Sequence, residues 1–243
     1  MDDAINSLYL TFASYRLGDD FSGCDCCVDP KHSKNLASRP LRALTFGDLE
    51  HYATKAMTTW GNVRHFKHFL PRVLELSIEH RDDFLDLAVV FGKLAYAKFD
   101  AWPQREKEAV TQFLAEYWNL QLAEPIVGAF EDGIDTVLCA ISNALPSVQS
   151  FLNKWINTPT DNANRHLAAF VLHNAGSLLK GKRLSSAFWD LSAVPHREVV
   201  RWLLSDDLLD FLSSADAAVL ADDFSYAHPQ LLAIRASLSE PAV

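Results

Sequence analysis

Apolar side chains recur every three or four positions along nearly the whole chain. The first segment, residues 2–16, places Ile5, Leu8 and Phe12 at this spacing, which gives a helix one apolar face. The same pattern predicts further helices, most of which follow a Pro, Asp, Ser or Thr start signal. They cover residues 45–60, 62–78, 82–99, 103–122, 133–145, 147–157, 161–179, 196–204 and 216–237.

Signals for β-strands are weak throughout the sequence. No stretch alternates cleanly between apolar and polar residues, and Val, Ile and Thr do not cluster between turn dipeptides. The connections between the predicted helices look short, so neighbouring helices should pack antiparallel. We therefore predict an all-α fold, a single helical domain over residues 1–243. It is an irregular multi-helix bundle or a short, HEAT-like α-solenoid of antiparallel helix pairs.

Two local signals refine the predicted helices. Thr45 and Asp48 form a capping-box pattern, in which Asp48 replaces the usual Glu. Asn62 is suited to cap the next helix. Pro71 lies inside that helix, where proline removes a backbone donor and clashes with the preceding turn. We expect a kink or a break at Pro71.

Three of the four cysteines lie within the segment "FSGCDCCVDPKH". Cys24 and Cys27 have the two-residue gap common among zinc ligands, and thiolates are soft donors that suit zinc. The predicted metal ligands are Cys24, Cys26, Cys27 and His32, within a cysteine-rich knuckle or loop over residues 17–43. Two alternatives remain open. The cysteines can pack as an ordinary loop, or a C-x-x-C pair can serve redox chemistry, although the thioredoxin-like form requires a βαβ setting.

Composition restricts the compartment and the class of partner. The chain has a formal charge of −9, which argues against a general nucleic-acid coat. It contains no apolar run of 18 residues, so we expect no membrane span. The N-terminus begins with acidic residues, whereas a secretory signal begins with basic ones. These features predict a cytoplasmic protein, and in a reducing compartment clustered thiols favour metal ligands or free thiols over disulfides.

Charge is distributed unevenly along the chain. Residues 30–72 carry eight Lys or Arg residues and two acidic residues, a balance of +6, in a protein that is acidic overall. Such asymmetry indicates either two faces that meet within the fold or two surfaces for different partners. The first interpretation is favoured, because surface charges usually only solvate a fold.

The segment "TTWGNVRHFKHFLPRVLEL" combines aromatic anchors with basic residues. Arginine beside aromatic side chains is typical of binding hot spots. The predicted binding surface consists of Trp60, Arg64, His65, His68 and Arg72. The alternative is an amphipathic helix whose histidines and arginines hold neighbouring loops.

The cysteine knuckle, "PLRALTFGDLEHYATKAMTTWGNV" and "FKHFLPRVLEL" together resemble the leading region of an uncharacterised family of bacterial proteins. The resemblance covers roughly residues 20–76. It implies a bacterial, intracellular, helical protein, and it assigns no activity and no catalytic residue.

Common enzyme signatures, such as G-x-S-x-G, a phosphate-binding loop and H-E-x-x-H, are missing from the sequence. We therefore favour a non-enzymatic, cytoplasmic protein-interaction protein: an adaptor, an inhibitor or an immunity-type binder of an unidentified protein partner. One alternative is a zinc-stabilised nucleic-acid-binding or regulatory protein that uses the basic segment 30–72. A second is an enzyme whose pocket gathers distant residues, with Arg64, His68, Arg72 and Glu75 as candidates.

Overall fold

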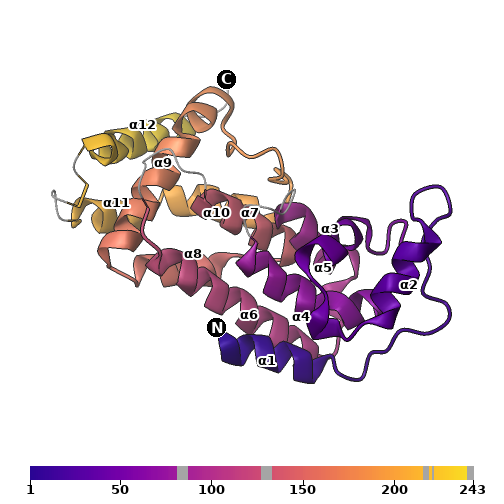
Figure 1. Cartoon of the computed structure of the whole chain (residues 1–243). Helices are drawn as coiled ribbons and strands as arrows, with labels where there is room; N and C mark the ends of the chain where they lie inside the picture. Colours follow the sequence, from indigo (N-terminus) through magenta and orange to yellow (C-terminus); the bar gives the residue numbers. More distant parts are fainter. Residues whose placement is uncertain (81–86, 127–132, 216–218, 221, 240–243) are drawn as a thin grey trace. The chain divides into compact units, whose positions relative to one another are not determined.

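The computed structural model describes residues 1–80, 87–126, 133–215, 219–220 and 222–239. In this part of the chain it contains twelve α-helices, three short 3-10 helices and no β-strand (Figure 1). The predicted all-α fold class is thus confirmed, whereas the HEAT-like arrangement stays a prediction. The predicted helix starts at Asp82 and at residue 216 lie outside the described residues.

The chain divides into two compact units, whereas a single domain over residues 1–243 is expected from the sequence. Unit 1 comprises Met1–Tyr117 and unit 2 comprises Trp118–Val243, so that the boundary falls within helix α6. Unit 1 holds α1 (Asp2–Thr11), α2 (Pro30–Ser38), η1 (Leu41–Ala43), α3 (Phe46–Lys55), α4 (Val63–Glu79), α5 (Leu87–Tyr96), η2 (Phe99–Ala101) and most of α6 (Gln104–Ala123).

Helix α4 supplies much of the interior of unit 1. Its apolar positions Phe66, Phe69, Leu70 and Val73 are each no more than 1% exposed, as expected for the face of an amphipathic helix that packs on a core. The helix continues through Pro71, so the alternative of a break at this residue is wrong. Burial of Pro71 within the packed face favours the helical path despite the missing donor.

The predicted caps of α3 and α4 are both confirmed. Thr45 and Asp48 form a reciprocal capping box at the start of α3. The side chain of Asn62 accepts hydrogen bonds from the backbone of Arg64 and His65 at the start of α4. The ring of His65 in turn accepts from the Asn62 backbone amide, so a histidine takes the place that Glu or Gln usually fills.

Helix α2 lies inside the segment 17–43, for which the sequence predicted a cysteine-rich loop. Asp29 caps α2 by accepting from the Lys31 amide, and Pro30 occupies its first turn, where the missing donor costs nothing. Only Ser33 and Leu36 are buried along its nine residues. Such a short, mostly polar helix has too few apolar positions for its period to be visible in the sequence.

Unit 2 holds the end of α6, α7 (Gly133–Ala144), α8 (Gln149–Ile156), α9 (Asp161–Gly181), α10 (Val194–Leu203), α11 (Asp206–Ser213), η3 (Asp222–Tyr226) and α12 (Ala227–Ser239). Helices α9 and α12 lie side by side (Figure 1). Trp155, Phe170 and Trp202 form an aromatic cluster among α8, α9 and α10. In the described part of the chain, no helix combines the length and the apolar character needed to cross a membrane.

Candidate metal centre

Residues 18–29, which we term the cysteine loop, lie between α1 and α2 and pack against the turn that joins α3 to α4. The Cys24 amide donates to the Thr59 carbonyl at 2.7 Å, and the Gly61 amide donates to the Ser22 carbonyl at 3.0 Å. Gly23 and Trp60 form an isolated antiparallel bridge between these two hydrogen bonds. The backbone beside the first cysteine is therefore fixed to unit 1.

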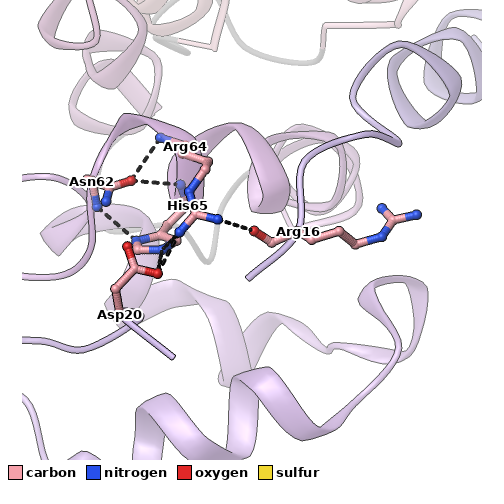
Figure 2. Close-up of polar contacts among 5 residues, drawn as sticks. All are labelled: Arg16, Asp20, Asn62, Arg64 and His65. Carbon is pink, nitrogen blue, oxygen red and sulfur yellow. Dashed lines mark hydrogen bonds and ion pairs between the residues drawn. The ribbon is translucent and has the colours of Figure 1, made fainter. Parts of the chain in front are cut away.

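A polar cluster at the start of α4 holds the cysteine loop at Asp20, which precedes the first cysteine (Figure 2). The Asp20 carboxylate accepts from the Arg64 guanidinium at 2.5 Å, and it lies 3.4 Å from Nε2 of His65. Arg64 also donates to the Arg16 carbonyl at 3.1 Å. Because Nδ1 of His65 accepts from the Asn62 amide, the neutral ring carries its proton on Nε2, which faces Asp20.

Charge and burial set the protonation of this cluster. The hydrogen bond from Arg64 lowers the pKa of Asp20, so this carboxylate is ionised at neutral pH. Burial lowers the pKa of His65 despite the nearby Asp20, because a buried ring favours its uncharged form. The cluster thus pairs one anion and one cation around a neutral, fully buried histidine.

Apolar side chains anchor the loop from the inside. The Phe21 ring packs against Tyr52, Trp60, His65 and Phe69. Glycine is required at position 23, because a Cβ atom there would lie 2.4 Å from Cβ of Val28. This close approach lets the chain turn sharply between the buried side chains of Phe21 and Val28.

The three thiols lie on the outer side of this anchored loop. The Sγ atoms of Cys24 and Cys26 are 2.7 Å apart, and those of Cys26 and Cys27 are 3.1 Å apart. All three sulfurs lie within 4.8 Å of one another and all three residues are exposed. The turn is closed by the amides of Cys27 and Val28, which both donate to the Cys24 carbonyl at 2.9 Å. This group could hold a metal ion.

Hydrogen bonding makes the three thiols unequal. The pKa of Cys24 is lowered, because hydrogen bonds stabilise its thiolate. The largest contribution comes from the Cys26 thiol, the next from the Cys26 backbone amide, and smaller ones come from Cys27. Hydrogen bonds to Cys24 and Cys27 raise the pKa of Cys26 to about 12. Cys24 is therefore the thiol that ionises before Cys26. Amides that point at a cysteine sulfur favour the ionised form that metal ions require.

The structure separates the remaining predicted ligand from the thiols. His32 is exposed on α2 and does not belong to the group of three sulfurs. The fourth cysteine, Cys139, is buried in unit 2 and lies outside the group of three.

The five residues of the predicted binding surface have different environments. Trp60 is 2% exposed and His65 is fully buried, so the structure places these two inside the fold. Arg64 is exposed and paired with Asp20. His68 and Arg72 are partly buried, and Arg72 pairs with Glu75 at 2.6 Å. The stretch around α4 thus holds neighbouring segments in place, which corresponds to the alternative interpretation of this sequence.

Most cations of the basic segment 30–72 are paired with carboxylates within unit 1. Among the described residues, five of its eight cations lie within 4.0 Å of a carboxylate. These pairs are Arg39–Asp48, Arg42–Glu75, Arg64–Asp20, Lys67–Glu106 and Arg72–Glu75. The uneven charge along the sequence therefore becomes mostly intramolecular pairing in the fold.

Sequence reasoning did not find the residues that support the cysteine loop. Asp20 carries no motif, and Thr59 contributes only its backbone carbonyl. Comparison of the chain with protein-family models, with curated proteins and with solved structures finds no match.

Proposed function

We propose that the protein binds one zinc ion through the thiolates of Cys24, Cys26 and Cys27. The observation that carries this proposal is the group of three exposed sulfurs within 4.8 Å of one another, on a loop whose backbone is fixed on both sides. Thiolates are among the preferred ligands of zinc. The lowered pKa of Cys24 supports the first step, because binding requires a deprotonated sulfur.

The geometry fits zinc after a small adjustment. Sulfur ligands about 2.3 Å from a tetrahedral ion lie about 3.8 Å apart, whereas the closest thiols here are 2.7 and 3.1 Å apart. Exposed cysteine side chains can spread by rotation about χ1 while the anchored backbone stays in place. Zinc usually takes four ligands, so three thiolates leave one position for water or for a donor from another molecule.

The position of the site favours a role in binding over a role in folding. The loop is already held by backbone hydrogen bonds, by the Asp20–Arg64 pair and by the buried Phe21 ring. An ion at its exposed outer side would add a reactive coordination position to a surface that is already formed. We therefore propose a metal-dependent interaction protein, in which a protein partner supplies the remaining ligand.

Zinc content tests the proposal. Protein purified under reducing conditions without added metal is analysed for zinc and is then titrated with a chromophoric chelator as competitor. We expect about one zinc ion per chain. In Cys24→Ser, Cys26→Ser and Cys27→Ser, we expect affinity to fall at least about tenfold, because each variant loses one Zn–S bond.

Cys139→Ala is the matched control, because it removes the cysteine that is buried in unit 2. It should retain the zinc stoichiometry of the unmodified protein. Zinc-free protein that also fails to take up added zinc would contradict the proposal. So would a zinc affinity of all three serine variants equal to that of the unmodified protein.

A further inference from the structure

A cavity of about 450 Å³ lies in unit 1 and is lined by no cysteine. Its wall is built by the end of α1 and the residues that follow it, by the C-terminal part of α2, by residues 39–41 and by α4. This volume is within the range of small-molecule sites. None of the three clustered cysteines lines it.

The wall combines apolar surface with basic groups and contains no acidic residue. Its apolar and aromatic members are Tyr9, Phe12, Ala13, Tyr15, Leu17, Ala37, Pro40, Leu41 and Pro71, and its basic members are Arg16, Arg39 and His68. A small concave site with a few convergent polar groups is the usual form of a ligand pocket. The sign of these groups selects an anion.

Arg16 is the cation available to a ligand. Its guanidinium donates only to the Ala13 and Tyr15 carbonyls, and it has no carboxylate partner in the described part of the chain. Arg39, by contrast, is already paired with Asp48. A guanidinium bound only to carbonyls keeps its positive charge uncompensated, and its planar donors match a carboxylate or a phosphate.

His68 presents one defined ring nitrogen. Its Nδ1 lies 3.0 Å from the Tyr15 carbonyl and must donate to it, so Nε2 is left for another partner. Burial, and then the charge of Arg16, lower the pKa of His68. The influence of Arg16 places both groups in one electrostatic environment, in which a bound anion would offset the arginine charge.

The two tyrosines contribute ring surface rather than hydroxyl groups. Tyr9 donates its hydroxyl to Glu75 at 2.6 Å, and Tyr15 donates to Glu106 at 2.5 Å. The two hydroxyl groups are therefore already used in hydrogen bonds to Glu75 and Glu106. The rings of Tyr9 and Tyr15, together with Phe12, Leu41 and Pro71, leave an apolar wall for the body of a ligand.

We infer that this cavity binds a small organic anion, in which a carboxylate or a phosphate monoester contacts Arg16 and an apolar body contacts the aromatic and proline wall. The inference is independent of the metal centre, since it uses none of the cysteines.

Isothermal titration calorimetry with two probes, phenyl phosphate and benzoate, tests this inference. We expect saturable binding of at least one probe at one site per chain, and the better probe identifies the preferred headgroup. Arg16→Gln should weaken binding about tenfold or more, because it removes a charge-assisted contact. Ala37→Phe, at an exposed wall position, should weaken binding by filling the cavity while leaving the charge unchanged.

Lys34→Gln is the matched control, because it removes one exposed cation of α2 that does not line the cavity. Its affinity should stay within about twofold of the unmodified protein, since the pocket contacts are intact. The absence of saturable binding, or equal affinity in Arg16→Gln, would overturn the inference. Equal affinity for inorganic phosphate would exclude a role for the apolar wall, and equal affinity for benzyl alcohol would exclude anion recognition.

Discussion

His65 is a buried histidine that performs the work of a capping residue. Its Nδ1 accepts from the Asn62 amide, and its Nε2 faces Asp20 on the cysteine loop. From the sequence, His65 was assigned to a binding surface because its segment combines basic residues with aromatic anchors. That composition is shared by hot spots and by buried networks, and only the position of residue 20, which lies 45 positions earlier, distinguishes the two.

His65→Gln should reduce the pH dependence of stability. Burial lowers the pKa of His65, so the ring is protonated more readily in the unfolded chain. The stability that the neutral ring contributes is present above about pH 6.5 and is lost as the pH falls below it. Urea unfolding at pH 7.5 and 5.5 gives the free energy of unfolding at each pH. Between these values His65→Gln should lose less stability than the unmodified protein, with a difference of up to about 1.4 kcal/mol per pH unit.

Asn62→Ala separates capping from titration. This variant loses the cap of α4 but keeps His65, so the free energy of unfolding should fall by about 1 kcal/mol at both pH values. If His65→Gln keeps the full pH dependence of the unmodified protein, the neutral buried state that we assign to His65 is wrong.

At the scale of elements, helices with several apolar turns could be predicted from the sequence and the loop geometry could not. The segments that became α4, α6 and α9 have long apolar periods, and their capping residues are local. Helices α2 and α11 were not predicted; α2 buries only two of its nine residues, so its sequence shows no clear apolar period. The exposed thiol group followed from cysteine spacing, whereas its anchors on the α3–α4 turn are backbone contacts that carry no residue signature.

A buried ion pair joins α4 to α6 within unit 1. Nζ of Lys67 lies 2.6 Å from the Glu106 carboxylate and 4.1 Å from the centre of the Trp102 ring. Both charged residues are 7% exposed. Removal of one partner leaves the other charge buried without compensation, which is the costly case.

Lys67→Met should lower the free energy of unfolding by about 3–5 kcal/mol. The double variant Lys67→Met/Glu106→Gln should be less destabilised than Lys67→Met alone, because it leaves no uncompensated charge and keeps an acceptor for Tyr15. Glu79→Gln, at the half-exposed end of a 3.8 Å pair with Arg72, should cost less than about 1 kcal/mol. Urea unfolding measures these losses in the free energy of unfolding. A loss in the double variant equal to the sum of the losses in the two single variants would contradict the pairing of the two charges.

In the whole molecule, the basic residues that cluster along the sequence are mostly paired with acidic residues in the fold. The segment 30–72 carries +6 along the chain, yet most of its cations pair with acidic residues, some of them distant in sequence, such as Asp20 and Glu106. Paired cations cannot contribute fully to a phosphate-binding surface. This pairing weakens the case for nucleic-acid binding through segment 30–72, and we propose the metal centre and the Arg16 cavity as binding sites instead.

We propose that three thiolates of the cysteine loop hold one metal ion. Zinc K-edge X-ray absorption of the zinc-loaded protein reports the number and the kind of its ligands. We predict three sulfur neighbours at about 2.3 Å and one nitrogen or oxygen neighbour at about 2.0–2.2 Å. A first shell made only of nitrogen and oxygen, or one with fewer than three sulfurs or with four, would be incompatible with a site of three thiolates.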